Sequence, residues 1–135
     1  MKFNLEKSLG VSVQSCQPDQ ITLQMLSQGG DAPVQETRVC TKSVVLCPTG
    51  EVIDWDLNHF DALTESHFGL VWQHQPELVI FGTGQSQHFP AARLLEPFAR
   101  SAIGIEVMDT TAACRTYNIV QSEGRKAMAL LIIES

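Results

Sequence analysis

Two uninterrupted apolar segments constrain the fold of this chain most strongly. They are "LVIF" at residues 78–81 and "AMALLII" at residues 127–133. Continuous apolar runs of this length are typical of strands at the centre of a sheet that is covered on both faces. Between them the sequence contains a helical segment after Pro90, a strand at 104–109 and a second helical segment within 110–123. This order predicts a βαβαβ unit with parallel strands.

The N-terminal part of the sequence has the patterning of β structure. Apolar and polar residues alternate over 11–25 on either side of a turn signal that contains Pro18, which predicts a hairpin. A Gly-rich segment at 27–33 predicts a flexible loop, and further strand material follows over 37–48 and 51–55. We therefore predict that residues 1–135 form a single three-layer α/β domain: a central mixed sheet with a C-terminal βαβαβ unit and additional N-terminal β-hairpin structure.

Proline and capping residues mark the ends of the predicted helices. Residues 64–75 carry apolar residues at helical spacing behind Thr64, a favoured N-cap residue, and Pro76 ends this segment. The next helix opens at Pro90 and contains Pro97. Because a proline inside a helix removes a backbone donor, Pro97 predicts a kink or a division of that helix.

The charge and the absence of targeting signals exclude several classes of protein. The net charge is −6 and the nine Lys and Arg residues are scattered, whereas nucleic-acid binding needs a clustered basic face. No apolar run reaches the roughly 18 residues that a membrane-spanning helix needs. Residues 1–10 lack the apolar stretch of a signal peptide. We therefore expect a cytoplasmic protein that binds no nucleic acid and spans no membrane.

The four cysteines and four histidines are the candidates for metal or thiol chemistry. They form no C-x-x-C pair and match no familiar zinc-ligand spacing, so we expect no metal and no cofactor. Cys114 lies in the first turns of a predicted helix, where the helix dipole can lower a thiol pKa. Burial beside Ala112 and Ala113 is the favoured interpretation, and a nucleophilic pair with His88 is the alternative.

The turn after the first apolar strand has the order of a phosphate-binding loop. In "FGTGQ", Gly82, Thr83, Gly84 and Gln85 connect a strand to a helical segment, where backbone amides can hold an anion. The dinucleotide fingerprint G-x-G-x-x-G is incomplete because Gln87 stands where its third glycine belongs, and no Walker lysine is present. The alternative is a tight strand-to-helix turn that needs the backbone freedom of glycine.

The segment 106–125 places candidate recognition residues on one helix. Asp109 or Thr110 can cap the helix, and Thr111, Arg115, Asn118 and Ser122 follow one another at helical spacing along its polar side. This side is either an ordinary solvated face or a recognition face with the Arg115 guanidinium as its anchor. If the last three strands are parallel, the turn at 82–85 and the start of this helix lie at the same carboxyl edge of the sheet, where open α/β sheets usually bind ligands.

Several of these motifs together resemble the Mth938-like domain family. The resemblance rests on "PELVIFGTG", "GIEVMDTTAACRTYN" and "SEGR", covers residues 55–133 well, and is closest to the proteobacterial form. The family contains small archaeal, bacterial and mitochondrial proteins, including an assembly factor of respiratory complex I. It implies an α/β fold with a central mixed sheet and no established enzymatic activity. Its motif positions fall here on Gly82, Thr83, Gly84, Met108, Asp109, Thr110, Ala113, Cys114, Arg115, Thr116, Tyr117, Asn118, Glu123, Gly124 and Arg125.

Two hypotheses of function follow. The first is a non-enzymatic interaction or assembly protein with a protein partner, because no nucleophile, metal or nucleotide motif is complete and because of the resemblance. The second is a binding protein for a small anionic ligand, or an undetected enzyme, that uses the crevice at the carboxyl edge. The sequence does not determine the oligomeric state. The candidate residues for partner or ligand are Gly82, Thr83, Gly84, Gln85, Asp109, Thr110, Thr111, Arg115 and Asn118.

Overall fold

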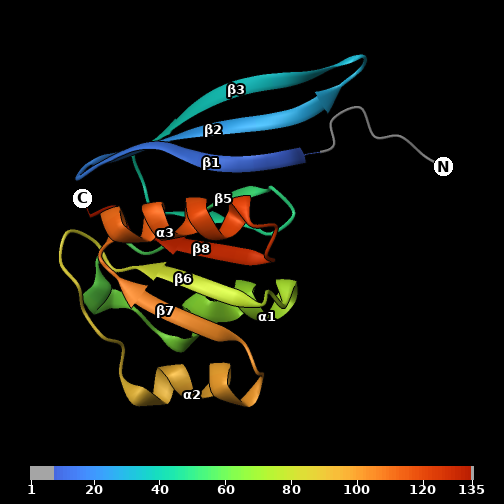
Figure 1. Ribbon diagram of the computed structural model, residues 1–135. Helices are drawn as coiled ribbons and strands as arrows, with labels where there is room; N and C mark the ends of the chain where they lie inside the picture. Colours follow the sequence, from blue (N-terminus) through green and yellow to red (C-terminus); the bar gives the residue numbers. More distant parts are fainter. Residues whose placement is uncertain (1–7, 135) are drawn as a thin grey trace.

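A five-stranded mixed sheet forms the centre of the protein. The computed structural model describes residues 8–134, and the order of strands in this sheet is β5-β4-β8-β6-β7 (Figure 1). The two apolar segments form the adjacent central strands β6 and β8, whose residues are all buried. The strands are β4 (Val44–Leu46), β5 (Val52–Asp54), β6 (Leu78–Gly82), β7 (Gly104–Met108) and β8 (Ala127–Leu131).

The C-terminal half is the predicted βαβαβ unit. Strand β6 pairs in parallel with both β7 and β8, whereas β4 is antiparallel to β8 and to β5. The connecting helices are α2 (Ala92–Arg100) and α3 (Thr110–Ser122). The prediction of an α/β fold with a mixed central sheet is therefore confirmed.

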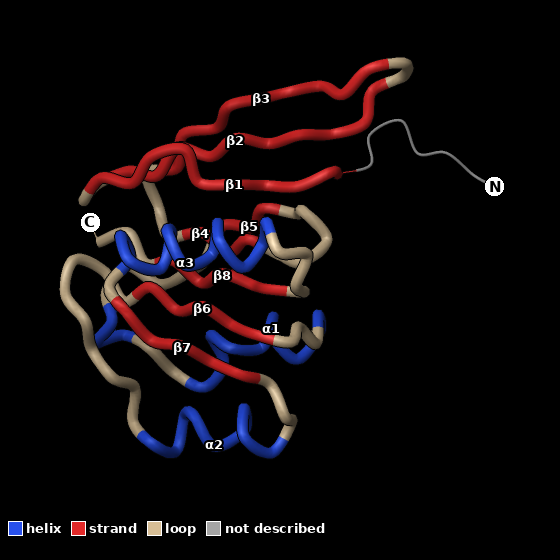
Figure 2. The backbone as a smooth tube through the Cα atoms, in the orientation of Figure 1, coloured by secondary structure: helices blue, strands red, loops and turns tan. Residues whose placement is uncertain are grey.

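Each face of the central sheet has its own hydrophobic core. On one face, side chains of β4, β6 and β8 pack against α3 and a separate N-terminal sheet. On the other face, neighbouring side chains of the same strands pack against α2, α1 (Gly69–His74) and the preceding 3-10 turn Glu65–Phe68. A further 3-10 turn spans Phe60–Ala62. Figure 2 shows the helices on both sides of the central sheet, which gives the three layers of the α/β unit, and the N-terminal strands beyond α3.

The N-terminal strands form a three-stranded antiparallel sheet, with β1 (Ser8–Gln17), β2 (Gln20–Gly29) and β3 (Ala32–Cys40) in that order. The predicted hairpin around Pro18 is confirmed. The predicted flexible loop at 27–33 is wrong, because β2 and β3 stay in register up to the pair Gly29–Ala32. Gly30, with φ of 72°, supplies the left-handed residue that a tight two-residue turn requires.

Pro97 does not divide its helix. Helix α2 runs without interruption from Ala92, two residues after Pro90, and it buries Leu94 and Phe98 against the central sheet. Pro97 is the sixth of the nine residues of this helix, beyond the first turn, so its missing donor removes one intrahelical hydrogen bond and the helix continues through it.

The predictions about a signal peptide and about a membrane-spanning helix concern different parts of the chain. Residues 1–7, where the sequence shows no signal-peptide pattern, lie outside the described residues. Within residues 8–134, no helix has the length and apolar character needed to cross a bilayer.

Candidate functional site

The turn after β6 and the start of α3 lie side by side at the carboxyl edge of the parallel strands. The Thr83 amide donates to the Met108 carbonyl over 2.8 Å, and the Thr110 amide donates to the Gly84 carbonyl over 2.8 Å. Asp109 caps α3, because its carboxylate accepts a 2.8 Å bond from the Ala112 amide. The parallel arrangement thus brings together the two segments that the sequence analysis singled out.

The two glycines of the turn are required by close packing and by backbone geometry. A Cβ atom at Gly82 would lie 2.9 Å from the Thr110 Cα atom, so α3 approaches the strand end too closely for any side chain. Gly84 has φ of 107°, and a Cβ atom there would lie 2.7 Å from Glu134 Cδ. The Gly-Thr-Gly sequence is therefore explained without a nucleotide.

The amides of the turn already have partners within the chain. The Gly84 amide donates to Thr110 Oγ1 over 2.9 Å, and that hydroxyl donates in turn to the Ile132 carbonyl over 2.8 Å. The Gln85 amide donates to Glu134 Oε1 over 2.7 Å. A carboxylate of the protein itself thus occupies the position at which an anionic ligand would meet the Gln85 amide.

A pocket of about 190 Å³ lies at this edge of the sheet. Four of the predicted site residues line it, and the turn between β1 and β2 supplies a further wall that was not predicted from the sequence. Neither Arg115 nor Asn118 lines it. The lining residues are Cys16, Gln17, Pro18, Gly84, Gln85, Thr110, Thr111, Ile132 and Ile133.

The thiol of Cys16 is the ionisable group of this pocket with a shifted pKa. A hydrogen bond with the Cys114 side chain, supplemented by one with Thr111, lowers the pKa of Cys16 to about 7 against the opposing effect of burial. The Thr111 hydroxyl lies 3.8 Å from Cys16 Sγ. The same contact with Cys16, together with burial, raises the pKa of Cys114. Cys114 is buried, as predicted, but it has a second thiol beside it.

Helix α3 presents three different faces to its surroundings. Ala113, Tyr117 and Val120 follow one another at helical spacing on one side of α3 and are buried in the core. Asn118 is half-buried and faces β1: its Oδ1 accepts from the Val13 amide and its Nδ2 donates to the Val13 carbonyl, both over 2.8 Å. The structure therefore gives Asn118 a scaffold contact within the chain.

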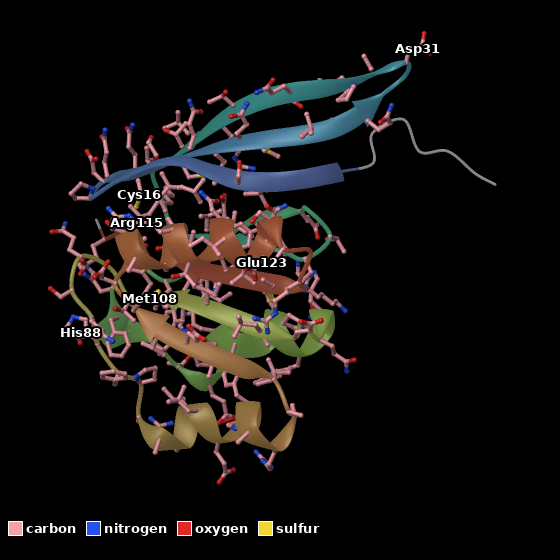
Figure 3. All side chains as sticks on the ribbon, viewed as in Figure 1. Cys16, Asp31, His88, Met108, Arg115 and Glu123 are labelled. Carbon is pink, nitrogen blue, oxygen red and sulfur yellow. The ribbon has the colours of Figure 1, made fainter. Side chains whose placement is uncertain are left out.

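The outward face of α3 consists of Thr111, Arg115, Ile119 and Ser122, all exposed. Ile119 is 59% exposed, and it was not among the residues predicted for this face. Arg115 makes no hydrogen bond or ion pair with any residue in the described part of the chain. In Figure 3, Arg115 lies near Cys16, at the end of α3 that is opposite to Glu123.

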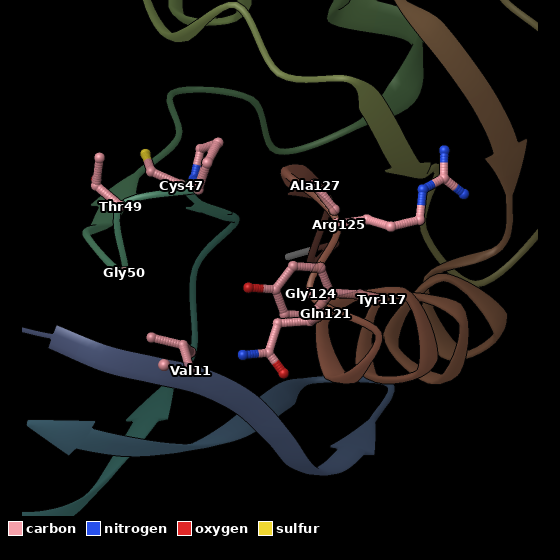
Figure 4. A pocket seen from close by; sticks show the side chains of 11 residues that line it. Val11, Cys47, Thr49, Gly50, Tyr117, Gln121, Gly124, Arg125 and Ala127 are labelled. Carbon is pink, nitrogen blue, oxygen red and sulfur yellow. The ribbon is translucent and has the colours of Figure 1, made fainter.

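A second pocket, of about 170 Å³, lies at the other end of α3. It is formed by the turn between β4 and β5, by β1 around Val11, and by Tyr117 and Gln121 of α3 (Figure 4). None of the residues predicted to bind a ligand or partner lines it. Three side chains that could hold a metal ion, Cys47, Glu51 and His74, lie close to the same turn.

These features define a small α/β fold with a glycine turn closed by the chain's own side chains and with an exposed outward face on α3. The chain belongs to a family described as "Protein of unknown function (DUF498/DUF598)", whose model matches residues 13–132.

The relatives that match this chain in sequence include a named assembly factor. The NADH dehydrogenase [ubiquinone] 1 alpha subcomplex assembly factor 3 of Homo sapiens and that of Bos taurus are each 35% identical over 83 residues. Each match covers 60% of this chain and 45% of the relative, so the chain aligns with less than half the length of these proteins.

Solved structures with this fold include two from Bordetella. A protein of Bordetella parapertussis is 25% identical, with a TM-score of 0.74 over 96% of this chain and 98% of its own. A Bordetella pertussis protein described as an Mth938-like domain has 22% identity and a TM-score of 0.70, over 100% and 94% of the two chains. The resemblance drawn from the sequence is therefore confirmed.

Proposed function

We propose that this protein is a non-enzymatic assembly factor that acts in the cytoplasm by binding a protein partner through the outward face of α3. The proposed partner is a subunit of an NADH dehydrogenase-type respiratory complex. Support for the partner comes from the relatives named as NADH dehydrogenase assembly factors, which match 60% of this chain.

The observation that carries this proposal is that Arg115 and Ile119 lie next to each other on the exposed outward face of α3. The two residues are four positions apart and lie on adjacent turns of α3, so their side chains are neighbours on the helix surface. Arg115 brings a guanidinium whose donors no described residue uses, and Ile119 brings a large exposed apolar side chain. Arginine is enriched in the few residues that dominate binding energy at protein interfaces, and it acts there beside apolar contacts.

The face is also held in place before any partner binds. The buried stripe of α3 packs on the central sheet, and Asn118 fixes the helix to β1. A rigid helix loses little conformational entropy on binding, which favours its use as a docking element.

Affinity purification of the tagged protein from its native cell under gentle detergent tests the proposal. We expect subunits of an NADH dehydrogenase complex to copurify with the wild type, and Arg115→Ala and Ile119→Ser each to reduce their recovery about tenfold or more. Arg100→Ala is the matched control, because Arg100 is an exposed helix arginine whose side chain pairs with Glu96 over 3.3 Å. Recovery of no stable partner, or an equal loss with Arg100→Ala, would count against the proposal.

The second candidate function is the binding of a small anionic ligand at the carboxyl-edge pocket. The specific observation in its favour is that the Gln85 amide already donates to a carboxylate, that of Glu134. A ligand carboxylate or phosphate would have to displace Glu134. A thermal-shift screen with phosphates and carboxylates is therefore expected to stabilise Glu134→Ala more than the wild type. A flat profile for both proteins rejects this candidate.

A further inference from the structure

Three potential metal ligands converge at the amino edge of the central strands, opposite to the crevice. Cys47 follows β4, Glu51 precedes β5, and His74 is the last residue of α1. Their donor atoms all lie within 4.8 Å of one another. Because His74 is 23 residues beyond Glu51 in the chain, no local spacing indicates this group, and only the packing of α1 beside the β4–β5 turn assembles it.

A hydrogen-bonded turn holds two of the ligands. The Cys47 amide donates to the Glu51 carbonyl over 2.8 Å, and the Gly50 amide donates to the Cys47 carbonyl over 2.9 Å. Cys47 is only 1% exposed, whereas the Glu51 side chain is 63% exposed. The turn therefore offers one fixed sulfur ligand and one carboxylate that can move to complete a site. In Figure 4 the Cys47 sulfur points away from Val11 and Tyr117, and Cys47 belongs to the core on the α1 side of the sheet.

The imidazole of His74 is oriented as in known metal sites. Its Nδ1 lies 2.9 Å from the Leu70 carbonyl oxygen. A carbonyl only accepts hydrogen bonds, so Nδ1 carries the proton of the neutral ring and the lone pair is on Nε2. That Nε2 atom lies 4.0 Å from Glu51 Oε1. A bond from the second ring nitrogen to a backbone carbonyl is the usual outer support of a metal-ligating histidine.

The chemistry of the three donors favours zinc. A thiolate and an imidazole suit Zn²⁺ and disfavour Mg²⁺ and Ca²⁺, which take oxygen ligands. With zinc bonds of about 2.0–2.3 Å, tetrahedral donors lie roughly 3.3–3.8 Å apart. The present separations, all within 4.8 Å, thus need to shorten by about 1 Å. Movement of the exposed Glu51 side chain would shorten its distances to Cys47 and His74, and a small shift of the end of α1 would bring His74 closer to Cys47. Two anionic ligands would neutralise the charge of the ion.

We propose that Cys47, Glu51 and His74 form a zinc-binding site with one coordination position open to solvent. Three protein ligands leave the fourth tetrahedral position to water. The site would connect the β4–β5 turn to the end of α1, two segments that are joined here by side chains alone.

Cobalt(II) spectroscopy of the full chain after chelator treatment tests this proposal, because thiolate ligation produces a near-ultraviolet charge-transfer band that other ligands do not. We expect one equivalent of Co²⁺ to generate this band and Zn²⁺ to abolish it. Cys47→Ser should remove the band, and His74→Gln and the surface change Glu51→Ala should each weaken Co²⁺ affinity about tenfold or more.

Cys16→Ser is the matched control, since Cys16 is a half-exposed thiol that contacts Cys114 and does not belong to the proposed ligand set. It should leave the band unchanged. No band in the wild type, a band that persists in Cys47→Ser, or a band lost with Cys16→Ser would overturn the proposal. Because Glu51 is exposed, Glu51→Ala tests the site even if Cys47→Ser does not fold, and an unchanged Co²⁺ affinity in that variant would also overturn it.

Discussion

Replacing Asn118 with alanine separates the scaffold role of α3 from its proposed recognition role. The side chain makes two 2.8 Å bonds to the backbone of Val13, one as acceptor and one as donor. Each bond contributes a net stabilisation of about 1 kcal/mol, and its loss leaves a partly buried backbone group without that partner. We therefore expect Asn118→Ala to lower the free energy of unfolding by about 2 kcal/mol, which corresponds to a fall in Tm of roughly 6 °C.

Urea unfolding followed by far-ultraviolet circular dichroism measures this change, and amide hydrogen exchange locates it. Exchange of the Val13 amide should accelerate in the variant, because its acceptor is gone. Ser122→Ala is the control: its hydroxyl donates to the Ile119 carbonyl within the same helix, on the exposed side. We expect that change to stay within about 0.5 kcal/mol. An equally small effect of Asn118→Ala, with unchanged exchange at Val13, would refute the stabilising role of the two Asn118–Val13 bonds.

Two further predictions follow from packing and from the paired thiols. Gly82→Ala should destabilise the protein by about 1–3 kcal/mol in urea unfolding, because its Cβ atom would meet the backbone of Thr110 at 2.9 Å. Gly69→Ala is the control, because a Cβ atom there meets nothing within 4 Å and the backbone is helical, and this change should be neutral or stabilising. An equal loss of stability at both sites would contradict the packing argument. Alkylation of Cys16 by iodoacetamide should show a midpoint near pH 7, because the thiolate is the reactive form. In Cys114→Ala the midpoint should rise toward the ordinary thiol value, and an unchanged midpoint would exclude Cys114 as the cause.

Local sequence patterns predicted the central architecture because burial there follows local periodicity. The apolar runs that became β6 and β8 are covered on both faces, and the stripe of Ala113, Tyr117 and Val120 follows helical spacing into the core. The turn at 82–85 also meets α3 as predicted, because parallel strands bring their carboxyl ends to one edge. The prediction of a flexible loop at 27–33 was wrong for a local reason: the glycines of this segment suit either a loose loop or a tight turn.

The contacts that line the carboxyl-edge pocket and fix α3 to β1 could not be predicted, because they join distant parts of the chain. Asn118 and Val13 are 105 residues apart, Cys16 and Thr111 are 95 apart, and Gln85 and Glu134 are 49 apart. Helical geometry alone places Asn118 and Ile119 within one turn of each other. Only the docking of β1 decides which of them is covered.

The same docking sets what a partner of α3 can contact. Because β1 covers Asn118, a partner on the open side meets Arg115 and Ile119. Arg115→Ala should therefore weaken partner binding while stability stays within about 0.5 kcal/mol. Asn118→Ala should lower the stability of the fold, and it should retain partner binding at temperatures where the variant is fully folded. If both variants lose binding in proportion to their loss of stability, the outward face of α3 is not the contact surface, and the partner must bind elsewhere on the fold.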